Sequence, residues 1–238
     1  MGEGGSNCLI TSPMSTLKPQ HVLYEDNHLL VVNKPAGVVT QGAASDQTSL
    51  VELAKQYLKQ KYNKPGNVYL GVVSRLDKLT TGIIVLARTS KAAARLTQAF
   101  KERNVAKSYQ ALIDKTELPN SLTLKDHIRK NDAARRMEIC SPQATNAQQA
   151  ILHLHQLNQF TQATHLEIAL ETGRKHQIRV QLANYGCPII GDRKYGSNTP
   201  FKNGIALHSA RLELVHPTQK EPMAFDAPLP AEWNRWLS

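Results

Sequence analysis

Apolar residues occur in short runs along the chain, and most of these runs have the length of β-strands. Residues 105–114 alternate strictly, so Lys107, Tyr109 and Ala111 are expected on one face of a strand. The other runs are rich in β-branched residues, which favour strands. The pattern predicts a hairpin of residues 22–24 and 29–32, followed by strands at 68–73, 83–87, 105–114, 150–157, 165–170 and 205–215.

Amphipathic stretches between these runs predict helices. The first begins at a capping box, in which Ser49 accepts from the Glu52 amide and the Glu52 side chain reaches back. The polar stretch from 117 to 145 shows no clear period and is predicted to be irregular. Strand pairs separated by helices favour an α+β fold with a largely antiparallel sheet. Further helices are expected at 90–103, 176–185 and 231–237.

The domain organisation follows from length and linkers. A chain of 238 residues has room for one large domain or two small ones, and no linker rich in Gly, Pro or Ser divides its core. Residues 1–19 contain Gly, Ser, Thr and Pro without periodicity, and they are predicted to form a flexible N-terminal tail. Residues 20–238 are therefore expected to fold as one domain.

Cysteine usage and hydropathy bear on the cellular compartment. Cys8, Cys140 and Cys187 lie far apart and form no C-x-x-C pair, so neither a disulfide framework nor a cysteine zinc site is expected. The longest apolar stretch, Ile83–Ala87, is much shorter than the ~20 residues that span a bilayer. The sequence therefore predicts a protein of the reducing cytoplasm with no membrane partner.

The charge balance points to a polyanionic partner. Lysine and arginine number 29 against 19 aspartates and glutamates, which gives a formal net charge of +10. An excess of this size most often accompanies nucleic-acid binding. A basic protein without a polyanionic partner is the alternative, because charge alone names no chemistry.

Three polar segments carry residues suited to chemistry. Asp77 lies in a loop between two aliphatic strands, where it either meets a substrate or bonds local amides. Tyr109 is either a core aromatic or a functional group. His176 and Arg179 are three residues apart and share a helix face. Since cations at a helix start oppose its dipole, an external anion or an internal carboxylate is expected to offset them.

Metal and cofactor sites find little support in the sequence. His153 and His155 share a strand face, and His165 is expected on a neighbouring strand, but no acidic or cysteine ligand is placed nearby. We therefore interpret these histidines as residues of the sheet surface. The chain also lacks a Walker A loop, G-x-G-x-x-G, G-x-S-x-G and H-E-x-x-H. Neither a metal nor a small-molecule cofactor is expected.

Three segments, the third followed by a further motif, together resemble motifs of the RluA family of RNA pseudouridine synthases. Residues 74–82 (S-R-L-D-K-L-T-T-G) are similar to its H-R-L-D-x-x-T-S-G motif, and residues 107–111 (K-S-Y-Q-A) to K-x-Y-x-A. Residues 173–179 (G-R-K-H-Q-I-R) and 188–196 (P-I-I-G-D-R-K-Y-G) resemble G-R-x-H-Q-I-R and P-I-x-G-D-x-x-Y-G. The resemblance covers about residues 22–230, in family order. It implies one α+β catalytic domain on a long, bent, mainly antiparallel mixed sheet, with helices around it and a central active-site cleft.

The resemblance also implies roles for individual residues. Asp77 would be the catalytic carboxylate, Tyr109 would pack against the target base, and Arg179 would hold Asp77 ionised and oriented. Arg75 would enter the RNA stack beside the flipped nucleotide. The residues expected to contact RNA are Arg75 together with Lys34, Lys107, Arg174, Lys175 and His176, and further basic candidates are Arg129, Lys130, Arg135 and Arg136.

The chain departs from the family motifs at four positions. Ser74 replaces the histidine common before Arg-Leu-Asp, and Leu79 and Thr81 differ from the usual Asp and Ser. Gln181 stands where histidine is frequent. These changes affect the expected RNA contacts and substrate choice more than the catalytic groups.

The sequence as a whole predicts a monomeric pseudouridine synthase that isomerises uridine in tRNA or rRNA after flipping it out. One alternative is an RNA-binding protein or chaperone on the same scaffold, with catalysis secondary or lost. Another is a two-carboxylate hydrolase, which would need a second acid near Asp77, and none stands at a telling spacing. The target uridine and the chemical route are not readable from the sequence.

Overall fold

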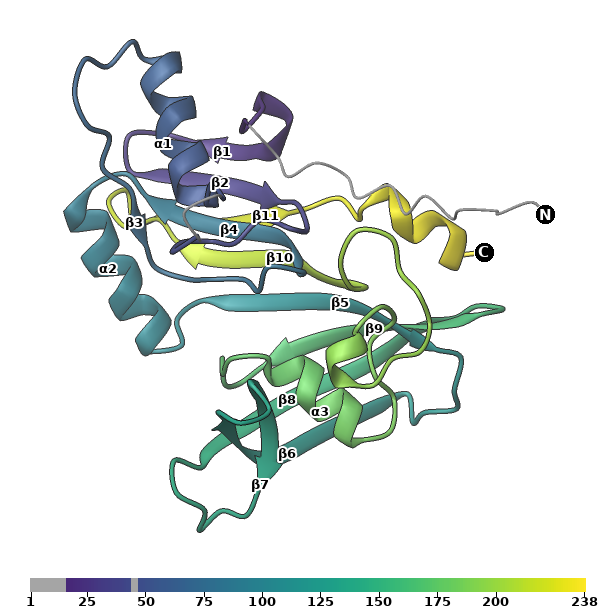
Figure 1. Cartoon of the computed structure of the whole chain (residues 1–238). Coiled ribbons are helices and arrows are strands. Elements are labelled where there is room, and N and C mark those ends of the chain that lie inside the picture. Colours follow the sequence, from purple (N-terminus) through teal and green to yellow (C-terminus); the bar gives the residue numbers. More distant parts are fainter. Residues whose placement is uncertain (1–15, 44–46) are drawn as a thin grey trace.

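A single sheet of eleven strands runs through residues 16–43 and 47–238, the part of the chain that the computed structural model describes (Figure 1). The order is β1-β2-β4-β10-β5-β9-β8-β6-β7, while β3 pairs with β4 and β11 with β10. The strands are β1 Val22–Glu25, β2 Leu29–Lys34, β3 Gly71–Val72, β4 Thr81–Ala87, β5 Ala106–Asp114, β6 Ser121–Asn131, β7 Arg136–Cys140, β8 Gln148–Gln159, β9 Ala163–Leu170, β10 Leu207–Val215 and β11 Pro222–Asp226.

Only the β4–β10 pair is parallel among these strands, so the predicted α+β class with a mainly antiparallel sheet is confirmed. The helices are α1 Leu50–Lys61, α2 Ser90–Lys101 and α3 Gln177–Asn184, with short 3-10 helices η1 Pro19–His21, η2 Arg193–Tyr195 and η3 Ala231–Trp236. Among the described residues, no helix is both long and apolar enough to cross a membrane.

The first half of the sheet, β1, β2 and β4, is covered on both faces. Alternate residues of β2 and β4 pack toward α1 on one side, as Leu30 and Ile84 do, and toward α2 on the other, as Val31 and Val85 do. Burial on both faces explains why these strands are continuous apolar runs rather than alternating ones. The capping box of α1 is confirmed, since Glu52 Oε2 accepts from the Ser49 amide at 2.7 Å.

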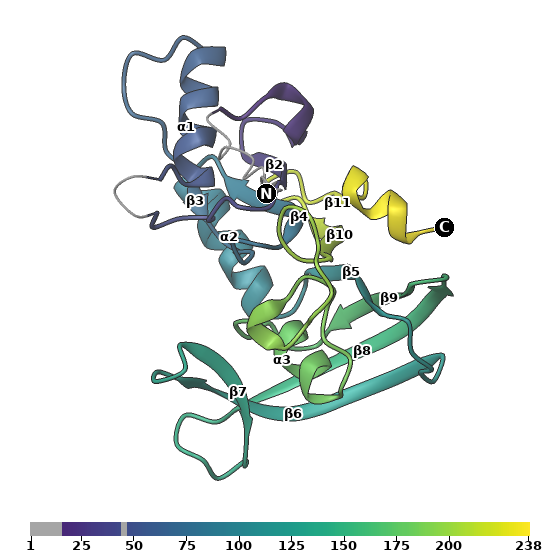
Figure 2. The same cartoon turned by 45° about the vertical axis from the view of Figure 1, so that its right-hand side comes forward.

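The second half of the sheet, β5 to β9, carries α3 on one face (Figure 2). Strand β10 lies between the halves, pairing with β4 through two residues and with β5 along most of its length. At the β4–β10 contact Gly82 has φ +107°, and a Cβ there would lie 2.3 Å from the Ser209 carbonyl oxygen. Glycine at this position therefore allows β4 and β10 to approach closely at the end of the loop that carries Asp77.

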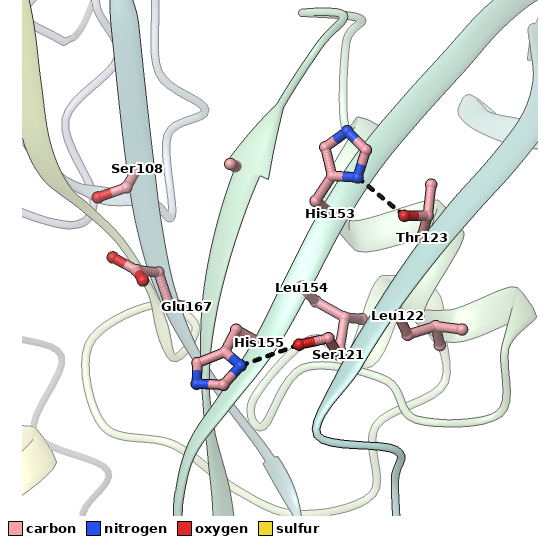
Figure 3. A pocket seen from close by; sticks show the side chains of 9 residues that line it. Ser108, Ser121, Leu122, Thr123, His153, Leu154, His155 and Glu167 are labelled. Atoms are coloured by element: carbon pink, nitrogen blue, oxygen red, sulfur yellow. Dashed lines mark hydrogen bonds between the residues drawn. The ribbon is translucent and has the colours of Figure 1, made fainter.

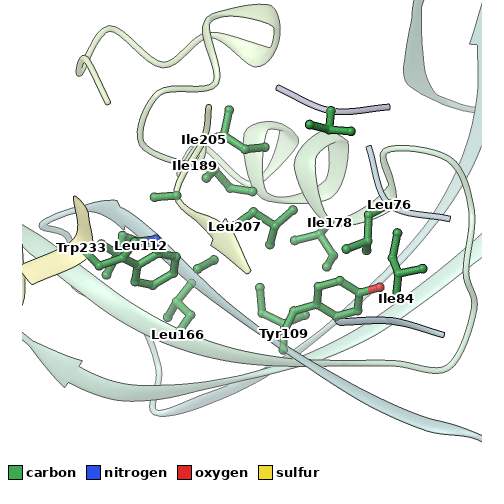
Figure 4. Close-up of a cluster of buried hydrophobic side chains, with 14 of the residues drawn as sticks. Leu76, Ile84, Tyr109, Leu112, Leu166, Ile178, Ile189, Ile205, Leu207 and Trp233 are labelled. Carbon is green, nitrogen blue, oxygen red and sulfur yellow. The ribbon is translucent and has the colours of Figure 1, made fainter. Parts of the chain in front are cut away.

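One hydrophobic cluster fills the junction of the two halves (Figure 4). It includes Leu76 and Ile178, the residues just before Asp77 and Arg179, and the ring of Tyr109. Trp233 of η3 closes the cluster and is fully buried. Packing of these neighbours is what brings three distant segments of the chain together.

Three sequence predictions need correction. The stretch from 117 to 145 is not irregular, because it contains β6 and β7. Only Leu124 and Ile128 of β6 are buried, so the strand is held by ladders to β7 and β8 and lacks an apolar alternation. Only Gly71–Val72 of the segment 68–73 is a strand, and the last helix is of the 3-10 type.

The predicted N-terminal tail, residues 1–19, lies mostly outside the described residues. Within the described part, Leu17 is already buried in the large cluster. Its packing shows that contact with the core begins before Val22, where the first strand starts.

Candidate active site

The loop between β3 and β4 holds Asp77 with its side chain 24% exposed. The residues on either side of Asp77 are fixed by the segment that follows β2. The Thr40 hydroxyl donates to the Leu76 carbonyl at 3.0 Å and accepts from the Leu76 amide at 3.2 Å. The Lys78 carbonyl accepts from the Gly37 amide at 2.8 Å. The backbone that presents Asp77 is therefore held on both sides.

Lys34 does not reach the surface, contrary to the prediction that it contacts RNA. It is fully buried, and its ammonium donates to the carbonyls of Pro35 at 2.9 Å, Val38 at 3.0 Å and Lys78 at 3.3 Å. Burial lowers the pKa of Lys34 to about 7, although the charge of Asp77 acts in the opposite direction. Lys34 therefore stabilises the loop that carries Asp77.

Arg179 brings α3 into contact with Asp77. Its Nη1 donates to Asp77 Oδ2 at 3.0 Å, while Nε and Nη2 donate to Asp192 Oδ2 at 2.7 Å and Oδ1 at 2.9 Å. Burial would lower the pKa of Arg179, but the bonds and charges of Asp192 and then of Asp77 raise it. The two-pronged bond to buried Asp192 fixes the plane of the guanidinium, so its remaining donor is aimed at Asp77.

His176 also lies against Asp77 rather than on the RNA-facing surface predicted for it. Its side chain is 11% exposed, and Nε2 lies 3.5 Å from Asp77 Oδ2. Burial lowers the pKa of His176 to about 4; Asp77 opposes this change, whereas Arg179 and two nearby lysines add to it. The imidazole is therefore neutral near pH 7. Its backbone has φ +54°, a left-handed conformation that turns the chain into α3.

Tyr195 joins these groups from η2. Its ring centroid lies 5.0 Å from the Arg179 guanidinium carbon, and its hydroxyl is hydrogen-bonded to His176 Nδ1 at 2.8 Å. The same oxygen accepts from the Met137 amide at 3.0 Å. Tyr195 thus contacts Arg179, His176 and the start of β7 at once.

Tyr109 lies beside Asp77 with only 8% of its surface exposed. Burial raises the pKa of Tyr109 to about 12, and the negative charge of Asp77 adds to the increase. The phenol therefore stays protonated near neutral pH. Its ring packs in the cluster that includes Leu76 and Ile178 (Figure 4).

The other residues predicted to contact RNA divide into two groups. Arg75, Arg174 and Lys175 are exposed next to Asp77 and His176, as that role requires. Lys107 lies elsewhere, with its ammonium 4.6 Å from the Phe100 ring centroid of α2, and burial lowers its pKa to about 8. No contact joins Lys107 to Asp77 within the described part of the chain.

A shallow pocket lined by residues of β5, β6, β8 and β9 contains His153 and His155 (Figure 3). His153 is hydrogen-bonded to Thr123 at 2.8 Å and lies 2.6 Å from Glu171, while His155 bonds Ser121 at 3.1 Å. His165 is buried and bonds Gln110 instead. In residues 16–43 and 47–238 no group of three potential ligands is placed to hold a metal ion.

Sequence reasoning missed three residues of the site. Asp192 and Tyr195 lie in a segment that the motif comparison matched, but nothing in the sequence pairs them with Arg179 or His176. Thr40 gave no signal at all. Asp192 is also the second acid that a hydrolase would need, but it is 1% exposed and both its oxygens bind Arg179, so it does not face a substrate.

Comparison with known proteins gives a consistent result. Residues 28–184 match the family model described as RNA pseudouridylate synthase. The chain is 32% identical over 230 residues to the ribosomal large subunit pseudouridine synthase D of Zymomonas mobilis, covering 90% of this chain and 70% of that protein. It is 35% identical over 236 residues to the protein of the same name from Xanthomonas campestris, covering 92% and 69%.

A solved structure agrees with these relatives. Human RNA pseudouridylate synthase domain containing 4 superposes with a TM-score of 0.75 at 25% identity, and the match covers 91% of this chain and 92% of that one. The family-model match, residues 28–184, includes Asp77, Tyr109 and Arg179.

Proposed function

Because the chain belongs to the RluA-type family of RNA pseudouridine synthases, we propose that it isomerises uridine in ribosomal RNA with Asp77 as the catalytic carboxylate. Family membership makes the protein an isomerase that acts on RNA. Ribosomal RNA is the proposed substrate because the names of the related bacterial enzymes specify the large ribosomal subunit. The alternative of an RNA-binding protein without catalysis gains no support from these relatives.

The observation that carries the proposal is the 3.0 Å bond from Arg179 to Asp77 Oδ2. His176 also faces Oδ2, so among the described residues both contacts to this carboxylate are made on one oxygen. Oδ1 is then the oxygen that would face the target nucleoside. A carboxylate paired with Arg179 and fixed in this way suits any of the three routes considered for the reaction, namely attack at C1′, addition at C6 or assistance at C2′.

Tyr109 and Arg75 would act on the nucleotide itself. A stacked uracil cannot react, and flipping it out costs a few kcal/mol. We propose that the Tyr109 ring packs against the flipped base and that exposed Arg75 fills the space left in the RNA stack. Exposed Arg174 and Lys175 would contact phosphates, so binding should weaken steeply with salt.

We further propose that the protein acts as a monomer in the cytoplasm. Asp77 and the three residues that contact or flank it all come from one chain, so the site needs no second copy. The two described cysteines, Cys140 and Cys187, are free thiols, and a reducing compartment would keep them in that state.

The substitution Asp77→Asn tests the function. It removes the carboxylate charge but keeps the size of the side chain, so ribosomal RNA binding should persist while pseudouridine formation falls to background. Tritium release from RNA labelled at C5 of uridine measures the reaction, because C5 loses its hydrogen when it bonds C1′. Asp226→Asn, at an exposed position on β11, is the matched control and should leave the rate unchanged. Activity in Asp77→Asn, or none in the wild type, would refute the proposal.

A further inference from the structure

The active site is assembled from two halves of the sheet. Asp77 is carried by the loop before β4, whereas Arg179 and His176 are carried by α3 on the second half. The position of the second half therefore determines how Asp77 is held. Any group that ties α3 to an RNA-facing element can link RNA binding to the orientation of the carboxylate.

Tyr195 makes such a tie to the β6–β7 hairpin. Its hydroxyl accepts from the Met137 amide at the start of β7, and the neighbouring Lys194 ammonium donates to the Arg135 carbonyl at 2.6 Å. The Tyr195 ring also packs with Met137 and Val180 in a small hydrophobic cluster between the hairpin and α3. The hairpin, η2 and α3 are thus joined by polar and apolar contacts.

The outer surface of this unit is strongly basic. Three acids lie on the hairpin: Asp132 and Glu138 are paired with Lys130 and Arg129, and Asp126 accepts from Gln181 Nε2 at 2.7 Å. Six cations at the turn into β7 and in the segments next to His176 and Tyr195 are exposed, namely Arg135, Arg136, Arg174, Lys175, Arg193 and Lys194. This surface suits a phosphate backbone passing beside Asp77.

We propose that Tyr195 is a positioning residue that couples the basic β6–β7 hairpin to Asp77 through His176. RNA bound on the hairpin then fixes the start of β7, and the Tyr195 hydroxyl passes that position to the imidazole and the carboxylate. This inference rests on the proposed function and adds to it a route by which correct RNA placement increases the rate.

The hydrogen bonds of Tyr195 determine which nitrogen of His176 carries the proton. Because the Tyr195 oxygen accepts from the Met137 amide, its own proton is free to be donated to His176 Nδ1. A neutral imidazole that accepts at Nδ1 carries its proton on Nε2, the atom that faces Asp77 Oδ2 at 3.5 Å. Movement of Met137 therefore changes how the Nε2 proton of His176 is presented to Asp77.

The first test is Tyr195→Phe, which removes the hydroxyl and keeps the ring over Arg179. The single-turnover rate at saturating ribosomal RNA should fall about 10-fold, as expected when a buried hydrogen-bond partner is lost. RNA affinity should change less than twofold. Nitrogen NMR of His176 should show the Nε2-protonated tautomer in the wild type and a mixture of tautomers in the variant. The control is Tyr57→Phe, which removes a phenol of α1 that donates to Glu25 of β1, and it should change neither measurement.

The second test combines Tyr195→Phe with Arg136→Gln in a double-mutant cycle. Arg136 is exposed on the hairpin next to Met137. At saturating RNA, Arg136→Gln should lower the rate about threefold in the wild type and have almost no effect in Tyr195→Phe, because coupled residues are not additive. A merely structural role for Tyr195 would give two losses that multiply.

The outcomes separate this inference from the proposed function. Losses that multiply, or an unchanged His176 tautomer in Tyr195→Phe, would overturn the coupling even if Asp77→Asn is inactive. If the wild type forms no pseudouridine, the NMR signal of His176 still tests the coupling. A change in this signal when RNA is added to the wild type, absent in Tyr195→Phe, would support the coupling. No change in the wild type would refute it.

Discussion

The buried lysine behind the Asp77 loop makes the stability of the protein depend on pH. In Lys34→Met the ammonium is replaced by an apolar side chain of similar length. The folded protein holds the pKa of Lys34 at about 7, whereas the unfolded chain has the ordinary value of 10.5. Between these values the unfolded state binds one more proton than the folded state, so the free energy of unfolding rises with pH.

The size of the effect follows from the same two pKa values. Each pH unit inside this window contributes 1.36 kcal/mol, so between pH 7 and pH 9.5 the wild type should gain about 3 kcal/mol of stability relative to Lys34→Met. At pH values well below 7, where Lys34 is protonated in both states, the difference should be constant. In that range two effects of Lys34→Met oppose each other. The carbonyls of Pro35 and Val38 lose their hydrogen-bond donor, which costs about 1–3 kcal/mol each. The variant also no longer buries a charge, which is favourable.

Urea unfolding of the two proteins at several pH values measures the difference directly. Other titrating groups occur in both chains and cancel in the comparison. Lys59→Met, which removes an exposed lysine of α1, serves as the control for loss of a surface charge. A difference between wild type and Lys34→Met that stays flat from pH 7 to 9.5 would show that Lys34 is not held in the way described.

Two further predictions concern the junction of the two halves. Arg179→Lys should lower the rate of pseudouridine formation about 100-fold, because an ammonium cannot keep two planar bonds to Asp192 and a third to Asp77. A rate above half that of wild type in the tritium-release assay would contradict this prediction. Gly82→Ala should destabilise the protein by more than about 3 kcal/mol. Residue 82 has a positive φ that alanine rarely adopts, and the added Cβ would collide with the backbone of β10. A urea midpoint equal to that of wild type would contradict this prediction.

Sequence motifs predicted the principal contact of the site but not its supports. The pairing of Asp77 with Arg179 joins segments 102 residues apart, and the motif resemblance indicated it before any coordinates. The burial of Lys34 was not readable, since a lysine after an apolar strand has the same pattern whether its ammonium meets water or three carbonyls. Local spacing carries no information about which distant backbone groups fold over a side chain.

Strand β6, which the residue pattern did not predict, also shows that local spacing does not determine the fold. Strand β6 has polar residues at most positions, and its two buried residues, Leu124 and Ile128, are four apart. That spacing matches a helix as well as a strand. The ladder to β8, a distant part of the chain, decides the conformation, so periodicity alone could not find it.

The place of β10 in the sheet also sets an order of events during synthesis. Its residues 207–215 come late in the chain, yet they are inserted between β4 and β5. A nascent polypeptide that ends before them has the carboxylate-bearing loop on one lobe and the guanidinium on another, with the strand that unites the lobes missing. The active site can therefore be complete only after β10 has been synthesised.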